Sequence, residues 1–188
     1  MAVMAEIADD RLLVERFNRG DEAAFDRIIE QHSADVAVLA NRLLGWPGDV
    51  EDITQDIFLA ALVGLKEFRC KCSLKTWLFT ITVNKCRTYR YRSMLRLRLV
   101  HYARSRVLCP TARLADQAAT DSDTFSRVRN AVRALPRKYR EPVVLRYLQE
   151  LPTDQIMTML GISENALQVR LHRARNLLKQ NLAELIED

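Results

Sequence analysis

The sequence predicts an all-α protein made of two small helical domains joined by a flexible linker, the C-terminal domain being a helix-turn-helix. Three observations support this fold class. The 188 residues include only five Gly and five Pro, and no pattern of short strands separated by tight turns appears. Apolar residues instead recur at helical spacing in two long stretches. Between these stretches the helical period is lost, which predicts a domain boundary there.

The first domain is predicted to span residues 10–95. Two helices fill residues 10–44 on either side of a break at 18–21, and two more cover residues 49–65 and 74–92. Gly45-Trp46-Pro47-Gly48 ends the second helix, because Gly and Pro interrupt helices. Asp49 can cap the third helix.

Residues 96–122 are the predicted linker. They begin as a basic stretch and end in a run of small polar residues, with a break at Cys109-Pro110. An extension of the preceding helix over residues 94–108 stays open as an alternative. The second domain is predicted to span residues 123–186, where the helical period returns. It is interrupted at Leu135-Pro136, at Leu151-Pro152 and at Gly161.

An acidic first part of the chain is followed by a strongly basic middle. Residues 1–65 carry five Arg and Lys against 13 Asp and Glu, a net charge of −8. Residues 66–109 carry 12 against one, a net of +11, and residues 110–188 carry 12 against 10, a net of +2. A one-sided basic segment with interleaved aromatic residues indicates a nucleic-acid partner, and the acidic part indicates a basic protein partner.

The sequence contains neither a run of 18 apolar residues nor a basic-then-apolar leader, so we expect a cytoplasmic protein without membrane insertion. Cys70, Cys72, Cys86 and Cys109 are then expected to be thiols. Their spacing is not that of a structural zinc site, and we expect no metal and no cofactor. Whether Cys70, Cys72 and Cys86 sense a metal or the redox state is left open.

The segment around Gly161 has the features of a helix-turn-helix. Gly161 supplies the positive φ that a tight turn needs, and Ile162 can fill the corner. Ser163 can cap the second helix. A buried stripe is predicted at Leu167, Leu171, Ala174 and Leu178.

The outward face of that second helix carries side chains suited to DNA. Gln168 could pair with adenine, Arg173 with guanine, and Val169 could touch a thymine methyl group. The remaining candidates are Asn165, Arg170, His172 and Arg175, of which the two arginines, together with Lys179, suit phosphates. A helical hairpin with a solvated polar face is the alternative. Turn, cap, buried stripe and basic outer face together favour DNA.

Two motifs resemble the extracytoplasmic-function (ECF) group of bacterial sigma factors. Leu135–Glu141, Leu145–Tyr147, Leu160–Ser163 and Arg170–Arg175 are similar to the fourth conserved region of that group. Asp49–Leu59, Phe68-Arg69, Thr76–Phe79 and Val83-Asn84 are similar to its second region. The resemblance covers nearly the whole chain apart from the linker, with the two motifs in the expected order.

The resemblance implies a core RNA polymerase surface on the helix that begins near Asp49. The implied residues are Asp49, Asp52, Gln55, Asp56 and Leu59, with Val63 continuing their line. In the family this face meets a basic coiled coil of the polymerase. An acidic line that continues as an apolar one gives both orientation and buried area to such a contact.

The resemblance also implies a surface that grips the −10 promoter element and helps to melt it. The implied residues are Arg69, Lys71, Lys75, Thr80, Asn84, Arg87 and Tyr91, with Thr76 on the same polar face and Lys85, Arg90 and Arg92 adding charge. A cationic groove and a base pocket must offset the few kcal/mol that each unstacked base costs. We expect Trp77 to be a core residue rather than a stacking platform.

The sequence therefore predicts a sigma factor that recruits core RNA polymerase to specific promoters and assists their opening. The helix-turn-helix would bind the −35 element, and an anti-sigma protein is expected from the family. The alternative is a conventional helix-turn-helix regulator with an N-terminal sensing or dimerisation domain, which would not need the acidic and melting helices. No phosphate loop or nucleophile–base pair indicates an enzyme.

Some residues depart from the family pattern. Met157 stands where the first helix of the motif usually has a small Ala. Gln168 and Val169 replace a basic residue and Ser, so base preference does not carry over from relatives. Cys70 and Cys72 occupy a loop in which small polar residues are more usual.

Overall fold

The fold was analysed in a computed structural model, which describes residues 2–45, 50–104 and 124–182. These residues form helices and no strand, so the all-α prediction is confirmed. The helices are α1 Ala2–Asn18, α2 Ala23–Leu44, α3 Val50–Gly64, α4 Leu74–Arg104, α5 Thr124–Ala134, α6 Arg137–Val143, α7 Thr153–Leu160 and α8 Glu164–Asn181. A short 3₁₀ helix (η1, Leu65–Glu67) follows α3, and a π-helical turn (η2, Val144–Leu148) follows α6. Asp49, the predicted cap of α3, and residues 105–122 of the predicted linker lie outside the described residues.

Helices α1, α3 and α4 pack against α2. Its apolar positions, among them Ile28, Val36 and Leu39, are fully buried because helical spacing brings them onto one stripe. Helices α3 and α4 close over this stripe, and α1 joins at the start of α2. Gly45, with φ of 69°, ends α2 in the left-handed conformation that terminates many helices.

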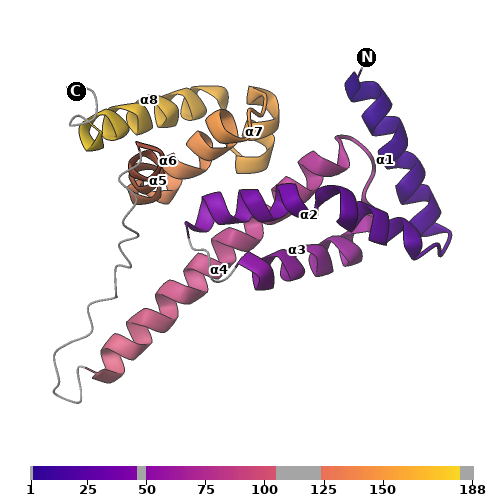
Figure 1. Ribbon diagram of the computed structural model, residues 1–188, viewed down its shortest axis with the longest axis horizontal. Helices are drawn as coiled ribbons and strands as arrows, with labels where there is room; N and C mark the ends of the chain where they lie inside the picture. Colours follow the sequence, from indigo (N-terminus) through magenta and orange to yellow (C-terminus); the bar gives the residue numbers. More distant parts are fainter. Residues whose placement is uncertain (1, 46–49, 105–123, 183–188) are drawn as a thin grey trace.

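Helix α4 is longer than the sequence predicted. It continues to Arg104, so residues 96–104, which were predicted to belong to the linker, are helical. The physical reason is that residues 93–104 contain neither Gly nor Pro and are rich in Leu and Arg, which are good helix formers. The lost apolar period therefore does not mark the end of the helix. In Figure 1 this end of α4 extends away from the other helices.

Helices α5–α8 form the second unit, and they gather on one side of α2 and α4 (Figure 1). Gly161 has φ of 65° and links α7 to α8, as predicted. The Ser163 side chain accepts a hydrogen bond from the Ala166 backbone N–H, which confirms the predicted cap. Leu167, Leu171 and Ala174 are buried and Leu178 is partly buried, which confirms the predicted stripe.

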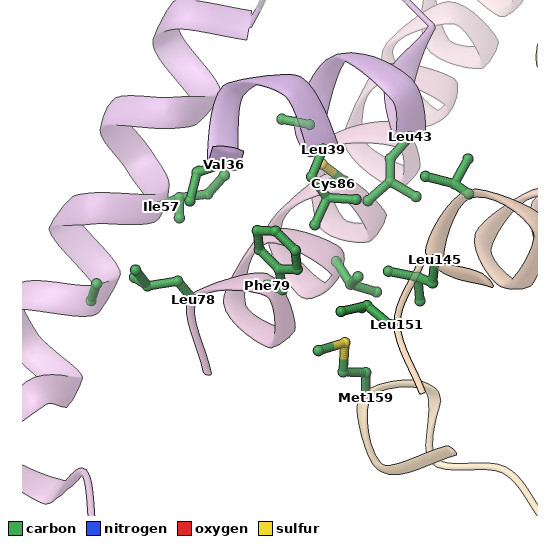
Figure 2. Close-up of a cluster of buried hydrophobic side chains, with 14 of the residues drawn as sticks. Val36, Leu39, Leu43, Ile57, Leu78, Phe79, Cys86, Leu145, Leu151 and Met159 are labelled. Atoms are coloured by element: carbon green, nitrogen blue, oxygen red, sulfur yellow. The ribbon is translucent and has the colours of Figure 1, made fainter. Parts of the chain in front are cut away.

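The two units share one continuous core. Phe79 and Cys86 of α4 and Leu39 and Leu43 of α2 lie in the same buried cluster as residues of the second unit (Figure 2). Those residues are Leu145, Leu151 and Met159. The sequence predicted two domains on a flexible linker, and it did not predict that they would bury apolar side chains against each other.

Candidate nucleic-acid interface

Helix α3 presents the predicted acidic and apolar line to solvent. Ile53, Ile57, Phe58 and Ala61 are buried on one side of the helix. Asp52, Gln55, Asp56 and Leu59 are exposed on the other. Leu59 is 61% exposed and Val63 80%, which is unusual for large apolar side chains on a tightly packed helix. Exposed apolar side chains that lie together are typical of binding surfaces.

A hollow of about 720 Å³ adjoins the end of this line. Its lining combines apolar residues, Phe17, Phe25, Leu62 and Val63, with the charged residues Glu22, Asp26 and Lys66. Phe17 and Phe25 pack against each other with ring centroids 5.8 Å apart. Sequence reasoning missed this hollow, because it forms between the end of α1, the start of α2 and the end of α3.

The loop before α4 is anchored from α1. The Leu74 backbone N–H donates to the buried Asp10 carboxylate over 2.6 Å, so a side chain 64 residues away caps the first turn of α4. The helix dipole also stabilises a negative charge at a helix N-terminus. Arg69 and Lys71 of this loop are exposed. Cys70 between them has φ of 51°, in the left-handed region.

The predicted −10 face of α4 is only partly exposed. Asn84 and Tyr91 face solvent. Lys75 forms an ion pair with Asp35 of α2, Nζ to Oδ2 2.6 Å, and the Thr80 hydroxyl donates to the Thr76 carbonyl over 3.0 Å. Arg87 forms a two-point contact with Glu141 of α6. The predicted residues thus share one helix but not one environment.

Two residues that the sequence placed with this face lie elsewhere. Thr76 is buried, because α7 covers it and its hydroxyl donates to the Gln155 side chain over 3.1 Å. The Arg90 guanidinium, expected in the cationic groove, donates to the Leu43 carbonyl over 3.4 Å. Burial lowers the pKa of Arg90. Trp77, predicted to be a core residue, packs against the core and against Phe68, with ring centroids 4.9 Å apart.

Within the described residues, no helix covers the outer face of α8 over most of its length. The predicted residues Asn165, Gln168, Val169, His172, Arg173 and Arg175 are exposed, and Arg170 is half-buried. Arg173 also reaches back to α6, where it donates to the Tyr139 hydroxyl and lowers the pKa of that tyrosine, with Lys138 adding to the effect. The Arg173 side chain stays accessible.

The cysteines of the described residues are thiols. Burial raises the pKa of Cys70 and Cys72, and it raises the pKa of Cys86 to about 12. Within the described part of the chain, no three His, Cys, Asp or Glu side chains are grouped as a metal site would need. No described helix has the length and apolar character that crossing a bilayer requires.

Both units match sigma-70 family models. The model of sigma-70 region 2 matches residues 28–96, which include α3 and most of α4. The model of sigma-70 region 4 matches residues 125–178, which include the helix-turn-helix. The chain belongs to the sigma-70 family. Members of this family direct RNA polymerase to particular promoters, and it is not an enzyme family.

This sigma factor is similar over almost its whole length to curated ECF sigma factors. It is 26% identical to the ECF RNA polymerase sigma factor SigW of Bacillus subtilis, over 92% of this chain and 96% of the relative. It is also 26% identical to the ECF RNA polymerase sigma-E factor of Escherichia coli, over 97% of this chain and 99% of the relative. These matches place the sigma factor in the ECF group.

Solved structures of similar architecture include a sigma factor. CnrH, solved in complex with the cytosolic domain of CnrY, is 28% identical with a TM-score of 0.66, over 93% of this chain and 97% of that one. The sigma factor RpoE of Bartonella quintana, solved with the anti-sigma factor NepR, is 23% identical with a TM-score of 0.62. That match covers 85% of this chain and 96% of RpoE, and it supports the shared fold.

Proposed function

We propose that three exposed helix faces of this sigma factor each bind a different partner in promoter recognition. The line on α3 binds core RNA polymerase, the loop at residues 69–73 with the exposed side of α4 binds the −10 element, and the outer face of α8 binds the −35 element. The chain has no reaction of its own and acts in the cytoplasm, where the polymerase is.

The exposed acidic and apolar line on α3 carries the proposal. Asp52 and Asp56 provide charge that orients a basic partner, while Leu59 and Val63 provide apolar area to bury. The hollow lined by Phe17 and Leu62 continues this surface. A DNA-binding regulator without a polymerase partner would have no use for large apolar side chains at these positions.

The two proposed DNA faces offer different kinds of contact to DNA. Arg69, Lys71 and Tyr91 offer charge and a ring on which an unpaired base can stack. On α8 the Gln168 amide can pair with a base edge and Val169 can touch a thymine methyl group, while Arg175 suits a phosphate. Neither face alone has many base-reading groups, so specificity depends on both being held at one spacing by the polymerase.

We also propose that an anti-sigma protein restrains this sigma factor. The support is the similarity to CnrH, which was solved in complex with the cytosolic domain of CnrY. A partner that covers the α3 line or either DNA face would block the functions proposed above.

Binding of the purified chain to core polymerase tests the proposal. The double variant Asp52→Arg with Asp56→Arg should lose copurification with core polymerase, because it turns attraction into repulsion at the centre of the contact. The matched control, Asp9→Arg with Glu30→Arg, changes the same charge at two exposed positions that lie on other helices. It should retain binding.

The same experiment extends to transcription. Core polymerase with the wild-type chain and fragmented genomic DNA should yield new transcript starts, which sequencing detects. Retention of the double variant on core polymerase, with helical content unchanged by circular dichroism, would show that the proposed α3 surface is wrong. No new starts with the wild-type chain would refute the function.

A further inference from the structure

A small cavity between α2, α4 and α6 is lined mostly by arginine side chains. It measures about 10 Å³, and Leu43 and Cys86 form its apolar side (Figure 2). The other lining residues are charged: Arg87, Arg90, Arg137, Arg140 and Glu141. Four positive charges therefore surround the cavity with one negative charge, which leaves a net charge of +3.

The carboxylate of Glu141 is shared by two of these arginines. Arg87 binds it at two points, Nη2 to Oε2 at 2.7 Å and Nε to Oε1 at 3.1 Å. The Arg137 Nε lies 3.6 Å from the same Oε1. The negative charge of Glu141 is thus matched by Arg87 and Arg137 before the other two arginines are counted.

Arg90 and Arg140 instead meet at one backbone carbonyl. Both donate to the Leu43 carbonyl, Arg90 from Nη1 over 3.4 Å and Arg140 from Nη1 over 3.2 Å. Two guanidinium groups that bind one oxygen atom lie close enough to repel each other. Among the described residues, no carboxylate forms an ion pair with either of them.

The same two arginines are buried in positive surroundings. Burial lowers the pKa of Arg140 to about 10, and Arg90 and Arg133 add to the effect. Burial also lowers the pKa of Arg90 against the smaller opposing effect of Glu141, and Arg137 lowers it further. Arg140 is 6% exposed, and no described residue accepts a hydrogen bond from its buried Nε. Buried cations without a counter-ion are costly, so a negative charge beside this pair would stabilise the fold.

The end of α2 neutralises only part of this charge. A helix C-terminus carries about half a negative charge, against the two guanidinium charges that meet there. One monovalent anion would bring the pair close to neutrality. A cavity of this size holds about one water-sized particle, so phosphate, sulfate and larger anions do not fit. Charge and size together therefore select a small monatomic anion.

We propose that this cavity binds one chloride ion, held by the guanidinium groups of Arg90 and Arg140. The ion places a negative charge where the two arginines repel each other. It binds the folded chain and not the unfolded one, so the stability of the free chain rises with chloride concentration.

Thermal unfolding of the free full-length chain, followed by circular dichroism, tests this. The two solutions are sodium chloride and sodium gluconate at equal ionic strength. Gluconate has the same charge but is too large for the cavity, so general screening is the same in both salts. The unfolding midpoint should be higher in chloride by about 3–6 °C when chloride reaches roughly ten times its dissociation constant.

The variant Arg90→Gln should abolish the difference between the two salts. It keeps an N–H donor for the Leu43 carbonyl but removes one of the two charges that hold the ion. The matched control is Arg92→Gln, because Arg92 is exposed on the same helix and the net charge changes equally. It should keep the difference. A difference that disappears in both variants would mean that overall charge, and not the cavity, causes it.

The line width of the chloride NMR signal reports the bound ion directly. It should broaden more with the wild-type chain or Arg92→Gln than with Arg90→Gln. Equal line widths for wild type and Arg90→Gln would overturn the inference, and so would equal midpoints of the wild-type chain in the two salts. The second comparison decides even if Arg90→Gln does not fold. Neither measurement contains polymerase or DNA, so a wrong assignment of the α3 surface would leave both unchanged.

Discussion

At the scale of single residues, buried charged side chains connect segments that are far apart in the sequence. Asp10 of α1 caps α4, and Arg140 of α6 donates to the carbonyls of Leu43, Arg133 and Leu135. Burial, with Arg90 and Arg133 nearby, lowers the pKa of Arg140 to about 10, so it stays protonated at neutral pH and keeps its donors. Losing one partner of such a bond leaves the other buried and unsatisfied.

The cap on α4 gives a prediction at this scale. Asp10→Ala should lower the free energy of unfolding by about 1–3 kcal/mol, because the Leu74 N–H loses its acceptor in a buried place. Urea unfolding followed by circular dichroism measures this. The neighbouring Asp9 is exposed, so Asp9→Ala is the control and should change stability by about 0.5 kcal/mol or less. Equal losses in both variants would refute the role of the cap.

At the scale of elements, the helices follow from apolar spacing and from their ends. Gly161 and Ser163 delimit the helix-turn-helix as the sequence predicted, because positive φ and N-capping are local properties. The end of α4 was predicted less well. Met94 and Leu95 near that end are exposed, and the apolar period that sequence reasoning follows depends on packing partners.

The recognition helix α8 gives the prediction for an element. Arg173→Ala should weaken binding to a promoter fragment by about 1–3 kcal/mol if the guanidinium contacts a guanine. The loss should vanish when that base of the −35 element is changed. Electrophoretic competition between fragments with altered bases, in holoenzyme, measures this.

Lys179→Ala serves as the comparison for Arg173→Ala. Lys179 is exposed near the end of α8 and suits a phosphate, so its loss should weaken all fragments alike and lower the salt dependence. A uniform loss from Arg173→Ala as well would assign Arg173 to the backbone and not to a base.

At the scale of the whole molecule, the charges and apolar faces of two halves are matched to each other. The basic residues of α4 that the sequence assigned to DNA include one, Arg87, that meets an acidic residue of the other half. Phe79, Val83 and Cys86 of α4 lie at helical spacing and are all buried, a signal of a second covered face beside the one that packs on α3. This signal was present in the sequence but does not say which partner covers the face.

The reactivity of Cys86 can report whether the two helical units stay in contact. Burial, and to a lesser extent the nearby Glu141, raises the pKa of Cys86 from the ordinary 9.0 to about 12. At pH 9 the thiol of the folded chain is therefore protonated, while that of an unfolded chain is half ionised. In the free chain, Cys86 should therefore react slowly with a thiol reagent at that pH. Adding core polymerase should raise the rate at least about tenfold if the units separate.

Mass spectrometry of the labelled peptide gives the rate for Cys86 alone. Cys72 is half-buried in the loop before α4 and serves as the internal control. Equal rates for Cys86 with and without polymerase would mean that the two units stay in contact in the complex.

The raised pKa of Cys86 also makes the stability of the folded chain depend on pH. The contribution of the protonated Cys86 thiol to the free energy of unfolding is complete below pH 9 and is lost as the pH rises through about 12.

Most of the helices, the helix-turn-helix and the family could be predicted from the sequence. These depend on local properties: apolar spacing, a glycine at positive φ, a capping serine and two motifs in order. How the two halves meet could not be predicted, because it follows from tertiary packing. Nothing local to Arg87 or Glu141 shows that they pair across 54 residues, and nothing local to Thr76 shows that α7 covers it. Such contacts follow from the shape and charge of two surfaces together, which one stretch of sequence does not contain.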